Sequence, residues 1–87
     1  MKNVYPVIFT PLGNDKDTIL IEVPDWNILT QGYGMADAMY MARDAIGLKG
    51  IDYEDNGKEI PEPSEMSAVD ASKGTFAEDG EGYVSLV

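Results

Sequence analysis

The stretch "PDWNILTQGYGMADAMYMARDAIGL", residues 24–48, changes its hydrophobic period partway along and so decides the fold. Residues 24–27 are a polar turn, and residues 28–31 form a short run that can make a strand. From Met35 onward the apolar positions recur at spacings of three and four, the period of one helix face. These positions are Met35, Ala38, Met39, Ala42, Ala45 and Ile46. The stretch therefore predicts a strand that leads into a helix.

The limits of this helix are set by glycines. Gly34 stands at the expected N-cap, where glycine is well tolerated. Gly47 and Gly50 weaken the helical pattern near its end. We therefore expect the helix to end near residue 48 or 49, with a further turn through Tyr53 as the alternative.

Strand patterns flank this stretch on both sides. Residues 4–10 are apolar on both faces and rich in β-branched and aromatic side chains, and turn-forming residues 11–17 follow them. Residues 18–23 alternate, with Ile19, Ile21 and Val23 on one face. Residues 82–87 are again β-forming. The sequence predicts an α+β fold, an antiparallel β-meander of order β-β-β-α-β with one helix packed on one face.

With 87 residues the chain has the length of one small domain. We expect a single domain, 1–87, with an ordered core at about 3–53 and 82–87. Residues 54–81 are rich in Glu, Asp, Ser, Pro and Gly and predict an acidic connecting segment. Because so short a chain buries a small core, we also expect it to self-associate into a homo-oligomer.

Composition excludes several classes of chemistry. Cysteine and histidine are both absent, which excludes a thiol nucleophile, a Ser/His/Asp triad and the usual zinc sites. The net charge of -10 repels nucleic acid and favours a basic partner, so we expect no direct nucleic-acid binding. No signal-peptide core or membrane-length apolar run is present, which predicts a cytoplasmic protein without membrane contact.

Four carboxylates near the first hairpin raise the possibility of magnesium chemistry. Asp15, Asp17, Glu22 and Asp25 would have to converge from core strands to hold two metal ions for phosphodiester hydrolysis. Two of the four lie in the expected loop and only Glu22 lies inside a strand. We therefore expect no catalytic residues, no metal and no cofactor, and we keep a magnesium-dependent ribonuclease H-like nuclease or hydrolase as the alternative function.

The turn in the opening stretch is the candidate for partner binding. Aromatic residues in loops beside acidic groups are common anchors in protein recognition. We predict partner contacts at the turn and on the strand after it. The residues are Asp25, Trp26, Asn27, Gln31 and Tyr33. The alternative is that Trp26 closes the end of the small core.

Five short motifs occur in a characteristic order along residues 4–64. They are Tyr5-Pro6-Val7-Ile8-Phe9, Glu22-Val23-Pro24-Asp25, Thr30-Gln31-Gly32, the helix Met35-Ala36-Asp37-Ala38 continuing to Ala42-Arg43-Asp44-Ala45-Ile46, and Ile60-Pro61-Glu62-Pro63-Ser64. Together they resemble the HicB-type antitoxins of type II toxin-antitoxin systems, and specifically the N-terminal toxin-neutralising domain. The strand at 83–87 matches the fourth strand of that family.

This resemblance implies both a fold and a partner. The fold is a partial ribonuclease H-like domain without the catalytic carboxylates. The partner is a HicA-type toxin, a small basic ribonuclease that the antitoxin neutralises by covering its active surface. Family members commonly continue into a DNA-binding segment, which residues 1–87 do not contain, so we expect no DNA-binding domain in this chain.

Overall fold

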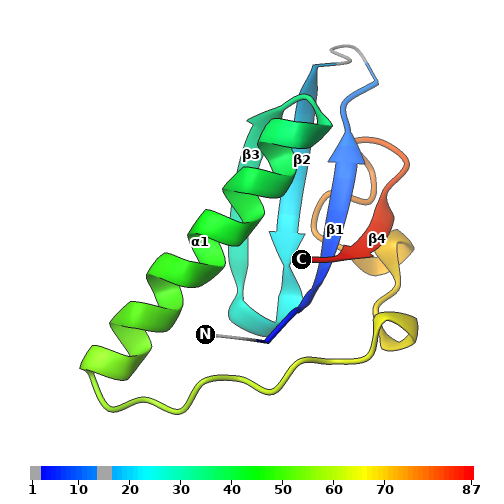
Figure 1. The fold of residues 1–87 in the computed structure, drawn as a ribbon. Helices are drawn as coiled ribbons and strands as arrows, with labels where there is room; N and C mark the ends of the chain where they lie inside the picture. Colours follow the sequence, from blue (N-terminus) through cyan, green and yellow to red (C-terminus); the bar gives the residue numbers. More distant parts are fainter. Residues whose placement is uncertain (1–2, 14–16) are drawn as a thin grey trace.

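The computed structural model describes residues 3–13 and 17–87 and contains one sheet and one long helix (Figure 1). In chain order the elements are β1 (Pro6–Pro11), β2 (Thr18–Val23), the 3-10 turn η1 (Pro24–Trp26), β3 (Ile28–Tyr33), α1 (Met35–Asp55), the 3-10 turns η2 (Met66–Ala68) and η3 (Ala71–Lys73), and β4 (Tyr83–Leu86). The strands lie in the order β3-β2-β1-β4, and every neighbouring pair is antiparallel. The predicted α+β meander with one helix on one face is confirmed. Part of the expected 11–17 loop lies outside the described residues.

The core lies between α1 and one face of the sheet. In β2 the alternating residues Ile19, Ile21 and Val23 are all buried, as their spacing predicts. The register places Ile21 between Phe9 of β1 and Thr30 of β3, which brings the apolar residues of neighbouring strands together. α1 contributes to the core a narrow stripe of mostly small residues. Its buried residues are Ala38, Ala42, Ile46 and Gly50.

Two boundaries and one side chain differ from the expectations. β3 continues to Tyr33 because Gly32 fits directly beneath Ala38 of the helix, and α1 continues to Asp55 rather than ending near residue 48. The helix end is held by tertiary contacts, since Lys49 Nζ donates to the Trp26 carbonyl at 2.6 Å. Such contacts override the weak helix propensity of glycine. Met39, expected in the core stripe, is exposed.

The segment between α1 and β4 covers part of the other face of the sheet. In Figure 1 it leaves the end of α1 (yellow), runs along the bottom of the view and reaches the side of the sheet where β4 lies. Gly74 lies close to Ile8, and Gly82 lies close to both Ile8 and Thr10. Both β1 side chains are consequently buried. The sheet is thus covered on both faces at β1, whereas Leu29 on β3 remains exposed.

Candidate partner-binding surface

Trp26 closes the core at the end of η1. Its side chain is only 1% exposed. The indole packs edge-on against Tyr5 at a centroid distance of 5.5 Å and against Tyr53 of α1 at 5.1 Å. Its ring therefore offers almost no surface to another molecule, and its burial favours the core-closing alternative. Among the described residues, the indole Nε1–H has no hydrogen-bond acceptor.

Asp25 holds the connecting segment onto the turn. One carboxylate oxygen accepts from the Ser64 backbone N–H at 2.7 Å, and the other accepts from the Ser64 hydroxyl at 2.6 Å. Close by in sequence, the Pro61 carbonyl accepts a hydrogen bond from the Tyr5 hydroxyl at 2.6 Å. Hydrogen bonds to a charged acceptor are among the stronger ones in proteins. The Asp25 carboxylate is thus engaged within the chain.

Glu22 makes a second link of the same kind. Its two carboxylate oxygens accept from the backbone N–H and the hydroxyl of Thr75, both at 2.8 Å. Glu22 and Asp25 are therefore each engaged with a different part of the connecting segment. Asp15, the first of the four candidate magnesium ligands, lies outside the described residues. Within 3–13 and 17–87, no group of three or more acidic side chains is arranged to hold a metal ion.

The three remaining candidate residues lie on or beside β3. Tyr33 is 63% exposed and its hydroxyl accepts from Gln31 Nε2 at 3.1 Å, so these two side chains form one small polar and aromatic surface. Asn27 is exposed and adopts a left-handed conformation with φ 54°, which asparagine tolerates better than most residues. It lies at the opposite end of β3, about 20 Å from Tyr33 at the usual rise of a strand. The predicted residues thus do not form one cluster.

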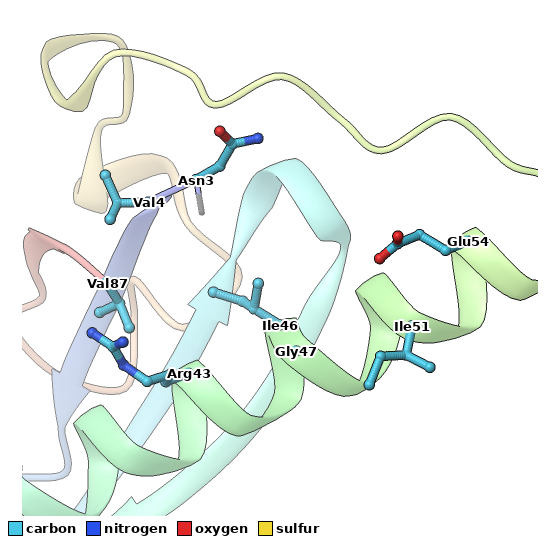
Figure 2. A pocket seen from close by; sticks show the side chains of 8 residues that line it. All are labelled: Asn3, Val4, Arg43, Ile46, Gly47, Ile51, Glu54 and Val87. Carbon is cyan, nitrogen blue, oxygen red and sulfur yellow. The ribbon is translucent and has the colours of Figure 1, made fainter. Parts of the chain in front are cut away.

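A feature that sequence reasoning missed is the solvent-facing side of α1. Tyr40, Leu48 and Ile51 are 65%, 63% and 59% exposed. Beside them, between α1 and the start of β1, lies a pocket of about 460 Å³ (Figure 2). Figure 2 shows Val4 and Val87 on the sheet side of this pocket and Ile46 on the helix side. The sequence pattern of α1 could have indicated this surface, because Tyr40, Leu48 and Ile51 lie on the helix face opposite the buried stripe.

The pKa of one carboxyl group in the connecting segment, that of Asp70, is lowered. Asp70 caps η3 by accepting from the Ser72 hydroxyl at 2.6 Å and from the Ser72 backbone N–H at 2.9 Å. These two hydrogen bonds hold the pKa of Asp70 below its ordinary value, and the nearby positive charge of Lys73 adds to the effect. The side chain is fully exposed, so the consequence for the fold is small.

Comparison with known proteins gives a likeness of structure. No family model and no curated protein matches the chain. Among solved structures, the chain is similar to one described as "Toxin-Antitoxin complex from Streptococcus pneumoniae", with a TM-score of 0.83 and 23% sequence identity. The alignment covers 98% of this chain and 67% of the other. At this identity the likeness establishes a shared fold. Within the described residues, no helix is both long and apolar enough to cross a membrane.

Proposed function

We propose that this chain is a HicB-type, antitoxin-like protein that binds and neutralises a small basic HicA-type ribonuclease toxin. The observation that carries the proposal is the fold likeness, over almost the whole chain, to a protein from a toxin-antitoxin complex. In this proposal the chain is not an enzyme, needs no cofactor, acts in the cytoplasm and forms a homo-oligomer. The domain is of the partial ribonuclease H-like type.

The contacts between the sequence motifs support the assignment to the HicB type. Three of the five motifs meet at the η1 turn, since Tyr5 donates to Pro61 and Ser64 donates to Asp25. Two others meet where Gly32 lies beneath Ala38. Motifs far apart in sequence therefore contact one another in the fold. A shared architecture explains their joint presence better than chance matches to short sequence motifs do.

Net charge supports a basic partner. The chain carries sixteen acidic residues against six Lys and Arg, so its surface attracts a basic ribonuclease much as RNA would. Association of opposite charges is fast at low salt and slows as salt screens it. The same charge disfavours direct nucleic-acid binding by this chain.

The residues assigned to partner binding in this proposal, as direct contacts or as supports of the turn, are Asp25, Trp26, Asn27, Gln31 and Tyr33. Asn27, Gln31 and Tyr33 are exposed and act as direct contacts. Asp25 and Trp26 act by fixing the turn, because one is hydrogen-bonded to Ser64 and the other is buried.

The test is RNA cleavage by the purified HicA-type ribonuclease proposed as the partner, titrated with the chain at two salt concentrations. We expect cleavage to stop near an equimolar ratio and inhibition to weaken at the higher salt. Unchanged cleavage at a large excess of the chain contradicts the proposal. The chain incubated with RNA and magnesium alone is the control, and RNA loss there favours a nuclease instead.

A pair of variants tests the contact residues. Replacing Gln31 and Tyr33 together by Ala removes exposed side chains on β3 and should weaken inhibition. Met66→Ala is the matched control, because Met66 is also exposed but lies on η2. Equal inhibition by both variants would remove Gln31 and Tyr33 from the interface.

A further inference from the structure

The outer face of α1 combines an apolar centre with an acidic rim. Its apolar centre is Tyr40, Gly47, Leu48 and Ile51, and its exposed charged residues are Arg43, Asp44, Glu54 and Asp55. At 100° per residue Tyr40, Asp44, Leu48, Ile51 and Asp55 point away from the buried stripe of the helix, and Arg43 and Glu54 lie at its flank. Tyr40, Arg43, Asp44, Gly47, Leu48 and Ile51 line a groove of about 340 Å³. A fully desolvated apolar centre with a polar rim is the usual anatomy of a protein interface.

No contact with the described residues 3–13 and 17–87 requires a glycine at position 47. It lies in the middle of α1, where glycine is less favourable than alanine, yet a Cβ atom built there meets no described atom within 4 Å apart from its chain neighbours and the nearby helix backbone. Gly32 is the instructive contrast, because its Cβ would lie 2.7 Å from the Ala38 Cα. Glycine is used where another molecule must approach the backbone closely. The open space above Gly47 lies in the groove and leaves room for a further side chain.

The charges around the groove decide what fits it. The groove itself is lined by one carboxylate, Asp44, and one guanidinium, Arg43. Two further exposed carboxylates, Glu54 and Asp55, follow one helical turn after Ile51. The net charge of -10 attracts a basic protein to this surface, whereas a second copy of the chain carries the same charge and gains no such attraction at this groove. A second copy of the chain is therefore the less favourable occupant.

We propose that the outer face of α1 is a second docking surface for the basic protein partner, which inserts an apolar side chain over Gly47 between Tyr40, Leu48 and Ile51. Lysine or arginine residues beside that side chain pair with the rim carboxylates. The inference rests on the proposed function, because the occupant is the partner named there. It assigns to that partner a surface on the helix side of the molecule, across the sheet from Gln31 and Tyr33.

The test measures binding of the same small basic ribonuclease by calorimetry, with three single variants of the full chain. Gly47→Gln fills the groove with a good helix former, and Leu48→Gln removes an exposed apolar side chain of the centre. Met66→Gln is the matched control, since Met66 is 48% exposed against 63% for Leu48 but lies on η2. Circular dichroism melting confirms that each variant is folded, and light scattering follows self-association of the chain alone.

We expect Gly47→Gln and Leu48→Gln each to weaken binding by about tenfold or more, with melting temperatures equal to or above that of the wild type for Gly47→Gln. Wild-type binding by both variants overturns the docking surface and leaves the proposed function standing. Loss of self-association with unchanged partner binding also overturns it, in favour of a second copy. Absence of binding by the wild-type chain refutes the proposed function itself, and the docking surface falls with it.

Discussion

The inner and outer faces of α1 use small residues in opposite ways. On the inner face, Ala38 rests on Gly32 of β3 so closely that no Cβ fits between them, and Trp26 packs under Tyr53 at the other end. On the outer face, Gly47 leaves open space between exposed apolar side chains. The inner face is completed by the chain itself, and the outer face is not. Substitutions on the two faces should therefore separate stability from binding.

The largest expected effect is at the inner face, at Trp26. Trp26→Ala removes the ring that packs against Tyr5 and Tyr53 and should lower the free energy of unfolding by about 3–5 kcal/mol. Chemical denaturation followed by circular dichroism measures this loss. Leu48→Ala on the outer face is the comparison and should change the free energy of unfolding by less than about 0.5 kcal/mol. Equal losses at both positions would contradict the distinction between the faces.

The next effect is at the contact between β3 and the helix. Gly32→Ala places a Cβ 2.7 Å from the Ala38 Cα and 2.9 Å from its backbone nitrogen, so α1 must move away from the sheet. We expect a loss of about 1–3 kcal/mol in the free energy of unfolding, the usual cost of overpacking. Thermal melting measures it. A melting temperature equal to that of the wild type would show that the two elements are less tightly packed than described.

The same substitution on the outer face should have the opposite sign. Gly47→Ala places its Cβ in open space and improves helix propensity, so we expect the free energy of unfolding to rise by about 0.5–1 kcal/mol. Denaturant titration of the two alanine variants side by side gives the sign directly. A destabilised Gly47→Ala chain would mean that the glycine serves the fold, and the contrast between the faces would be lost.

The smallest effect lies away from both faces, at Asp70. Since folding lowers the pKa of this carboxyl, its contribution to stability is present above the ordinary aspartate pKa of about 3.9 and is lost as the pH falls through the lower folded value. Carboxyl NMR titration should place the pKa of Asp70 below the ordinary aspartate value. Ser72→Ala should raise the pKa of Asp70 towards the ordinary value. An Asp70 pKa that is unchanged in this variant would show that the Ser72 hydroxyl is not the main cause.

The sequence predicted the architecture because the periodicities are local and clear. The alternation in residues 18–23 and the change of period at Met35 are both present in the structure. The helix end was misplaced because contacts made by Lys49 and Tyr53 with Trp26 depend on tertiary structure. Met39 was misplaced because the apolar residues of α1 lie on both of its faces, and periodicity alone does not select the face that meets the sheet.

The candidate site was harder to predict than the fold. An aromatic residue beside an aspartate in a turn has the same sequence pattern whether its ring points inward or outward, and Trp26 points inward. The sequence did not indicate that the Asp25 carboxylate is already hydrogen-bonded, because its partner, Ser64, is 39 residues away in sequence. The prediction that Asp25, Trp26, Asn27, Gln31 and Tyr33 bind a partner remains a prediction.

The pairing of β1 with β4 has a consequence for how the chain folds. Pro6 pairs with Leu86 and Phe9 pairs with Tyr83, so the two strands come from opposite ends of the described sequence. Contacts so distant in sequence form slowly because a long loop must close first. During synthesis, β1 to β3 and α1 are complete while residues 83–86 have yet to be added. We therefore expect the last strand to join a preformed meander, and the free edge of β1 is the surface exposed to aggregation until it does.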